Sequence, residues 1–180
     1  TIKLNDLYFD DSKTYLKSLD VVITTKCSMN CESCANLMQY YVAQKNTDED
    51  ILKAVKILSE NVDHISEYRI IGGEPLMNKN WAKITKGVID QDPNRSVYIY
   101  SNGTICPKDE QLEIFHGKKL NFYLTDYDDL SRNMEKVVKI LAKHGIGFYR
   151  KPAGNWVDCS RIKKHNRSTK QLKQVFKECC

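Results

Sequence analysis

Three cysteines lie close together at spacings that suit a metal or cluster site. Cys27, Cys31 and Cys34 form a C-x3-C-x2-C set within eight residues. Three thiolates can hold a cubane iron–sulfur cluster with one iron left without a protein ligand, and that open iron can bind a substrate or cofactor. Two alternatives stay open from the spacing alone. One is a zinc site with an open position, and the other is a helix that buries all three cysteines on one face.

Two further motifs follow strand-like runs. Gly72-Gly73-Glu74-Pro75 comes after EYRII, and Ser101-Asn102-Gly103-Thr104 comes after VYIY. A glycine pair lets the backbone approach a ligand closely, and Glu74 offers a carboxylate to an ammonium group. Ser101 and Asn102 supply hydroxyl and amide groups of the kind that hold a ribose or a carboxylate. Each motif alone is an ordinary turn, but together, each after a predicted strand, they indicate one site.

The elements that would position these motifs alternate along the chain. Runs rich in β-branched and aromatic residues predict strands over 19–25, 67–73, 96–103, 119–126 and 146–152. Helical patterns follow over 48–59, 79–89, 108–116 and 130–143, and a basic helix ends near Lys177. This repeated β-α order predicts parallel strands joined by right-handed crossovers.

The length limits how many such units fit. A complete eight-unit barrel needs about 250 residues, so a chain of 180 residues predicts an α/β fold of five or six units, an incomplete β/α barrel with a parallel sheet. An open doubly wound sheet uses the same local units and stays an alternative. In both folds the loops after the strands share one face and form the site. We expect an N-terminal arm over 1–18, a core domain over 19–158 and a basic C-terminal helix within 159–180.

Composition excludes several classes of protein. Hydrophobic residues at 41% and charged residues at 28% exclude a disordered or collagen-like chain. No apolar run reaches the roughly 20 residues of a membrane span. The net charge of +5 is local, because the stretch from Arg161 to Lys177 holds seven basic residues and no acidic one. Seven cysteines, an odd number, with no secretory leader favour a reducing compartment, and we expect the cytoplasm. The chain begins with Thr1 and stops on Cys180, so we expect it to be trimmed at both ends.

In TTKCSMNCESC, IIGGEP and YSNGT the chain resembles the radical S-adenosylmethionine (radical SAM) enzymes, over roughly residues 19 to 151. The resemblance implies a 4Fe-4S cluster held by the three cysteines, with the amino and carboxylate groups of SAM on the fourth iron. One electron then splits SAM into methionine and a 5′-deoxyadenosyl radical, which abstracts hydrogen from a substrate. By position, the metal ligands are Cys27, Cys31 and Cys34. Gly72, Gly73 and Glu74 would hold the methionine ammonium, and Ser101 and Asn102 would face the ribose or carboxylate.

The chain departs from the family pattern in two places. Ser33 stands where the family usually has an aromatic residue near the adenine, and Tyr40 or Tyr41 is a candidate to replace it. Five β-α units are countable where a complete family barrel has six, so the missing edge is either open or supplied by another segment or partner. FKECC resembles the start of a C-terminal extension with auxiliary clusters, or else Cys159, Cys179 and Cys180 are ordinary thiols. We interpret Cys106 as structural.

Other polar residues follow the last two predicted strands. Asp126 to Asp129, Arg150 and Lys151 are candidates, by location, for contacts with the substrate or with the SAM carboxylate. The alternative for the aspartates is helix capping, which we favour for Asp129. The sequence identifies no catalytic residue and no substrate: a peptide, a nucleotide-like and a sugar-like molecule all fit.

The expected partners follow from the radical chemistry. We expect reduction by a flavodoxin- or ferredoxin-type donor, which the basic helix would help to dock, and neither a membrane nor a nucleic acid as partner. Two competing functions stay open: a non-catalytic three-cysteine metal module with a basic nucleic-acid-binding tail, and an inactive radical SAM fragment.

Overall fold

The computed structural model describes residues 12–31, 34–43, 45–154 and 166–178. Its five parallel strands form one sheet in the order β1-β2-β3-β4-β5. The strands are β1 Tyr15–Val22, β2 His64–Ile71, β3 Ser96–Ser101, β4 Leu120–Asp126 and β5 Gly147–Pro152. The α-helices are α2 Asp48–Asn61, α3 Trp81–Gln91, α4 Asp109–Glu113, α5 Met134–Lys143 and α6 Thr169–Glu178. Short 3-10 helices are η1 Met38–Tyr40, η2 Pro75–Met77 and η3 Asp128–Leu130.

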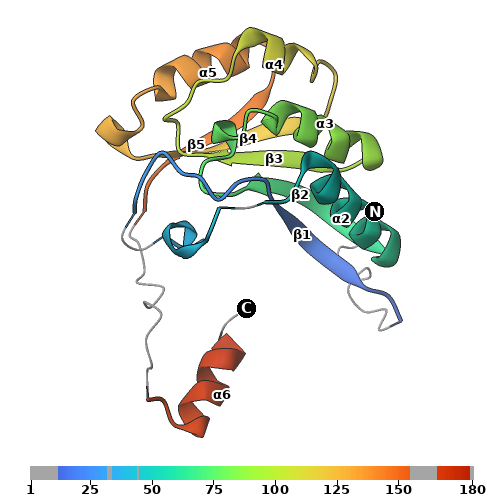
Figure 1. Ribbon diagram of the computed structural model, residues 1–180, viewed down its shortest axis with the longest axis vertical. Coiled ribbons are helices and arrows are strands. Elements are labelled where there is room, and N and C mark those ends of the chain that lie inside the picture. Colours follow the sequence, from blue (N-terminus) through green and yellow to red (C-terminus); the bar gives the residue numbers. More distant parts are fainter. Residues whose placement is uncertain (1–11, 32–33, 44, 155–165, 179–180) are drawn as a thin grey trace, which may run out of the picture.

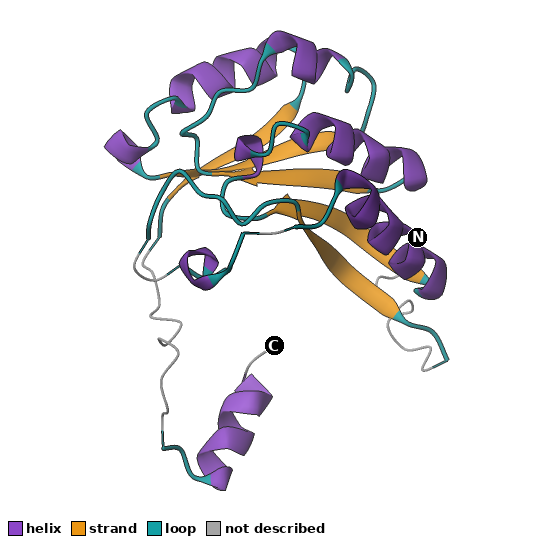
Figure 2. Ribbon diagram, viewed as in Figure 1, coloured by secondary structure: helices purple, strands orange, loops and turns teal. Residues whose placement is uncertain are grey.

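The strand order separates the two predicted architectures. A doubly wound sheet reverses its strand order at one point and carries helices on both faces. Here every strand pairs with the next one in the chain, and α2, α3, α4 and α5 lie along one side of the sheet (Figures 1 and 2). The incomplete β/α barrel is therefore confirmed, with five units in the described part of the chain.

The core lies between the sheet and these helices. Side chains alternate between the two faces of a strand, and on β2, β3 and β4 the helix-facing ones are buried aliphatic and aromatic residues. Burying each such side chain contributes about 1.5–3 kcal/mol to folding, so this layer fixes the strands and the loops at their ends. The most deeply buried apolar residues are Tyr68, Ile70, Trp81, Ile84, Val88, Ile89, Val97, Ile99, Leu112, Phe122, Leu124, Val137 and Leu141.

The first strand is displaced from the sequence prediction. It begins at Tyr15, inside the segment predicted as an N-terminal arm, because Tyr15 and Leu16 already pair with His64 and Ile65 of β2. It ends at Val22 instead of residue 25. The backbone that follows Val22 still forms hydrogen bonds with the chain at the end of β2.

Helix α5 begins four residues later than predicted. Residues 128–130 form η3, and Asp128 has a φ of 52°. The Ser131 hydroxyl accepts a hydrogen bond from Tyr127 N at 2.8 Å and donates one to Asn102 O at 2.7 Å. These contacts draw the loop toward β3 before the helix starts. The capping role predicted for Asp129 is therefore wrong, and Asn133 occupies the N-cap position.

The predicted basic helix is present as α6. No described helix is both long enough and apolar enough to cross a bilayer. Six residues named in the sequence analysis lie outside the described residues: Thr1, Ser33, Cys159, Arg161, Cys179 and Cys180.

Candidate functional site

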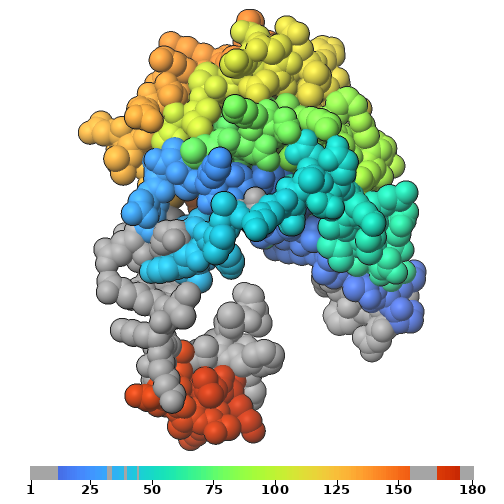
Figure 3. Space-filling model, viewed as in Figure 1, coloured from blue at the N-terminus to red at the C-terminus, as the bar shows by residue number. Residues whose placement is uncertain are grey.

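The three cysteines lie in the loop between β1 and η1, at the carboxyl edge of the sheet. Figure 3 draws the described part of this stretch in blue at the surface of the molecule. The described residues between 23 and 37 contain no helix, so the interpretation of the cysteines as one buried helix face is wrong. Cys27, Cys31 and Cys34 are half-buried thiols that form no disulfide. All three line one cavity of about 300 Å³ together with Met29 and Met38.

The glycine pair holds the start of this loop against β2. Gly73 N donates to Thr24 O at 3.1 Å, and Glu74 N donates to Lys26 O at 2.8 Å. A Cβ on Gly72 would lie 2.3 Å from Thr24 O, and one on Gly73 would lie 2.2 Å from Lys26 O. Only glycine allows this approach of two backbones. The two glycines therefore also have a structural role, which the sequence analysis did not predict: they allow the cysteine loop to approach the end of β2.

A second set of contacts holds the cysteine loop against the end of β3. The hydroxyls of Ser28 and Thr104 are 2.5 Å apart, and Asn102 Nδ2 donates to Ser28 Oγ at 3.1 Å. Asn102 Nδ2 also lies 3.9 Å from Cys27 Sγ, and Met29 N lies 3.5 Å from the same sulfur. Donors beside a thiolate stabilise its charge and tune the potential of a cluster bound to it.

Burial and neighbouring charges raise the pKa values of two of the three thiols. Burial raises the pKa of Cys27, a hydrogen bond from Met29 N opposes this, and the neighbouring Glu74, Cys31 and Cys34 charges raise it further. Burial and the Cys34 charge likewise raise the pKa of Cys31. Three thiolates this close repel one another, so a positively charged metal centre would stabilise their deprotonated form.

Glu74 is fully buried and connects the two loops. Its Oε1 accepts from Leu76 N at 3.2 Å, and its Oε2 accepts from Asn102 N at 2.8 Å. Burial raises the pKa of Glu74 to about 7, and hydrogen bonds from Asn102, Leu76 and Ser101 act in the opposite direction. The contact of this carboxylate with a ligand ammonium stays a prediction, because the structure directs both oxygens at backbone N–H groups.

We expect Glu74→Gln to lower the free energy of unfolding by about 1–3 kcal/mol, because the amide nitrogen would face one of two backbone donors and leave it unsatisfied. The pKa of Glu74 in the folded chain, about 7, lies above its ordinary value of 4.5. The stability it contributes is therefore fully present below about pH 4.5 and is lost as the pH rises to about 7. Urea unfolding of both proteins without metal, from pH 4.5 to 8, should show a steeper decline for the parent. Parallel pH profiles would contradict this account of Glu74.

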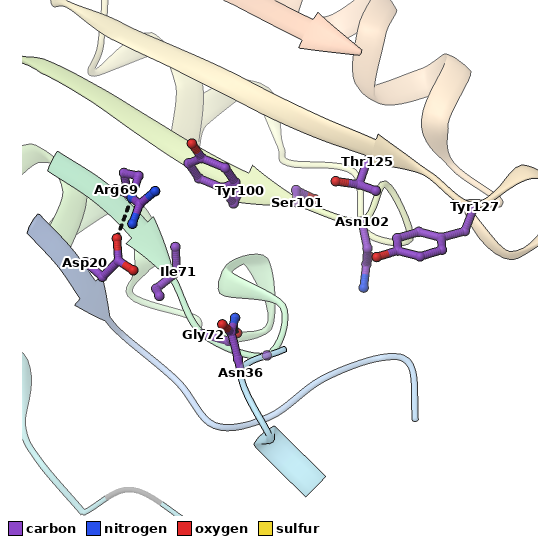
Figure 4. A pocket seen from close by; sticks show the side chains of 11 residues that line it. Asp20, Asn36, Arg69, Ile71, Gly72, Tyr100, Ser101, Asn102, Thr125 and Tyr127 are labelled. Atoms are coloured by element: carbon purple, nitrogen blue, oxygen red, sulfur yellow. Dashed lines mark hydrogen bonds and ion pairs between the residues drawn. The ribbon is translucent and has the colours of Figure 1, made fainter. Parts of the chain in front are cut away.

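A second, polar cavity of about 310 Å³ lies at the ends of β2, β3 and β4 (Figure 4). Gly72, Gly73, Ser101 and Asn102 line it, so the structure brings together four of the five residues predicted to bind SAM. Tyr127 also lines it, and burial and the nearby cysteine charges raise the pKa of its phenol to about 12. Tyr127 also lines a neighbouring cavity together with Cys31, so it adjoins both the polar cavity and the cysteine loop.

Several residues of this cavity were absent from the sequence prediction. Asn36 Nδ2 donates to Gly72 O at 3.2 Å. Arg69 Nε lies 2.5 Å from Asp20 Oδ1, and Tyr100 stands beside this pair. Polar residues at alternate positions of otherwise apolar strands are the signal that could have identified Asp20 and Arg69.

Other candidate residues lie elsewhere. Arg150 donates to Asp126 Oδ2 at 2.8 Å and to Glu135 Oε1 of α5 at 2.7 Å, so Arg150 and Asp126 bind each other on the helix side. Tyr40 and Tyr41 are 56% and 61% exposed and line neither of these two cavities. Cys106 is half-buried and packs against the core, as expected for a structural thiol.

The cysteine cavity suits an iron–sulfur cluster. Its donors are three soft thiols, which suit iron–sulfur clusters and also zinc. Among the described residues, no three His, Cys, Asp or Glu side chains converge closely enough to hold a single metal ion. In a cubane each thiolate binds a different iron, so the three sulfurs need not converge on one point.

Comparison with known proteins found one curated relative and two solved structures that resemble this chain. A protein from Syntrophomonas wolfei subsp. wolfei (strain DSM 2245B / Goettingen) named GTP 3′,8-cyclase is 24% identical over 150 residues, which cover 73% of this chain and 44% of that protein. The chain thus spans less than half the length of this relative. Two crystal structures of Streptococcus suis SuiB, the first of them bound to S-adenosylmethionine, superpose with TM-scores of 0.49 and 0.47 at 12% and 13% sequence identity. They cover 92% of this chain and 47% and 46% of SuiB.

The family assignment rests on a match that covers most of the chain. The family model described as the radical SAM superfamily matches residues 21–150. These include the cysteine loop, all of β2, β3 and β4, the last two residues of β1 and all but the last two residues of β5. This is the same stretch that carries the cysteine, glycine and asparagine motifs. The chain therefore belongs to the radical SAM superfamily.

Proposed function

We propose that this chain is the catalytic core of a radical SAM enzyme that binds a 4Fe-4S cluster and cleaves SAM reductively. One observation carries the proposal: the cavity lined by three thiols and the polar cavity at the strand ends lie at the same edge of the sheet. Asn102 lines the polar cavity and also contacts the cysteine loop. A ligand in the polar cavity would therefore lie beside a cluster on the thiols.

Each group of residues in the two cavities would bind a different part of the cluster or of SAM. Cys27, Cys31 and Cys34 would hold the cluster, which when bound supplies the electron that splits SAM into methionine and a 5′-deoxyadenosyl radical. The backbone carbonyl oxygens of Gly72 and Gly73 would accept hydrogen bonds from the SAM ammonium. Ser101 and Asn102 would contact its ribose or carboxylate. The hydrogen bonds from Gly73, Glu74 and Asn102 to the cysteine loop fix these groups relative to one another.

The substrate and the electron donor belong to the same proposal. The name GTP 3′,8-cyclase states that the relative acts on GTP, and this favours a nucleotide-like molecule among the substrates that the sequence left open. We propose a flavodoxin- or ferredoxin-type donor in a reducing cytoplasm, with the exposed Lys170 and Lys173 of α6 attracting its acidic surface.

The test is anaerobic reconstitution with iron and sulfide, followed by reduction with dithionite in the presence of SAM. We expect a brown protein that forms methionine and 5′-deoxyadenosine in equal amounts. Purified protein with stoichiometric zinc, or a reconstituted and reduced protein that forms no 5′-deoxyadenosine, would contradict the proposal.

A further inference from the structure

The sheet face opposite the helices carries aromatic residues that the proposed cleavage of SAM does not use. Tyr100, Tyr123 and Tyr149 stand in register on β3, β4 and β5. The ring centroids of Tyr100 and Tyr123 are 4.8 Å apart, and those of Tyr123 and Tyr149 are 5.0 Å apart. We call these three residues the tyrosine row. Tyr149, on the edge strand, is 58% exposed.

Two cations lie beside the tyrosine row. Arg69 Cζ is 5.9 Å from the centroid of the Tyr100 ring, and Lys151 Nζ is 5.2 Å from the centroid of the Tyr123 ring. Asp20 balances the charge of Arg69. Lys151 has no carboxylate partner in the part of the chain that the structure describes, whereas its neighbour Arg150 is fully paired on the helix side. Lys151 is thus available to bind an anionic group.

The tyrosine row is continuous with the polar cavity. Tyr100 and Arg69 line the same 310 Å³ space as Gly72, Ser101 and Asn102 (Figure 4). A molecule that gives up a hydrogen atom must touch the SAM that activates it. On this face, the molecule beside SAM would therefore lie against the tyrosine row.

We propose that the tyrosine row and Lys151 form a substrate site for a small molecule that combines a flat aromatic ring with an anionic group. The ring packs against the tyrosine edges or on the outer face of Tyr149, since aromatic pairs favour edge-to-face and offset-stacked contacts. The anion pairs with the Lys151 ammonium. A purine nucleotide and an aromatic carboxylate both have this chemistry. The substrate role rests on the proposed function, but the binding of such a molecule does not.

Calorimetric titration of the full chain separates these chemistries. The probes are inosine 5′-monophosphate, indole-3-acetate, inosine and inorganic phosphate, each with S-adenosylhomocysteine present so that the SAM site is filled. We expect a ring with an anion to bind at least about tenfold more tightly than inosine or phosphate alone, the difference that one charged contact makes. Tight binding of the nucleotide identifies phosphate as the anion, and tight binding of indole-3-acetate identifies carboxylate. Failure of both to bind would overturn the proposal.

Variants assign the binding to these residues. Lys151→Met and Tyr149→Ala should each weaken binding of the preferred probe about tenfold, and Tyr149→Phe should retain it. Lys139→Met, which removes an exposed lysine of α5, is the matched control. If the cross-strand rings only stabilise the sheet, Tyr149→Ala will lower the melting temperature and leave binding unchanged, and this overturns the proposal. Assay of SAM cleavage in the parent is independent: a parent that binds the probe but forms no 5′-deoxyadenosine contradicts the proposed function alone.

Discussion

Cys31→Ala is expected to abolish cluster binding and to lower 5′-deoxyadenosine formation by about 100-fold or more, because even partners outside the ligand shell typically contribute 10- to 100-fold. Cys31 lines the cysteine cavity together with Cys27 and Cys34, and two thiols cannot replace a three-thiol site. The measurements are iron and sulfide per chain, the absorbance of the reconstituted protein and the yield of 5′-deoxyadenosine.

Cys106→Ala is the matched control for this loss. Cys106 is a half-buried thiol in the loop after β3, and it packs against the core instead of lining the cysteine cavity. We expect this variant to keep its iron and its activity. Equal losses in the two variants would mean that reconstitution responds to general damage and not to the ligand set.

Gly73→Ala is the second variant for which we expect a large effect, on both stability and cluster binding. The new Cβ would lie 2.2 Å from Lys26 O and 2.8 Å from the Cβ of Cys27, so the cysteine loop must move away from β2. We expect a loss of about 3 kcal/mol in the free energy of unfolding, with most of the cluster-binding capacity lost in protein that still folds. Urea unfolding and iron content after reconstitution measure the two effects.

Gly154→Ala provides the comparison, since a Cβ at Gly154 meets nothing within 4 Å. This variant should match the parent in stability and iron content. If Gly73→Ala also matched the parent, the close approach between the glycine pair and the cysteine loop would not be needed for the site.

The sequence predicted the arrangement of the fold well because its evidence is periodic and local. Alternating apolar patterns identified all five strands, and a cysteine, a glycine or an asparagine motif followed each of the first three. Parallel strands end at one edge of a sheet, so the motifs had to meet. The strand order, which excludes a doubly wound sheet, depends on long-range pairing that local patterns do not contain.

The orientation of individual side chains could not be predicted in this way. Glu74 carries the residue type expected for an ammonium ligand, but its carboxylate lies between the two loops and binds their backbone N–H groups. Arg150 and Lys151 are adjacent in the sequence, yet one faces α5 and the other the tyrosine row. Alternation along a strand separates them, and the correct assignment requires the register of β5 against β4.

The most direct test of the central claim is electron paramagnetic resonance of the reduced, reconstituted protein with and without SAM. If three cysteines hold a 4Fe-4S cluster with one open iron, the signal of the reduced cluster will appear and will change in g-values when SAM is added. A signal that SAM leaves unchanged, in protein that contains a full complement of iron, would contradict the claim that the thiols leave one iron free for SAM.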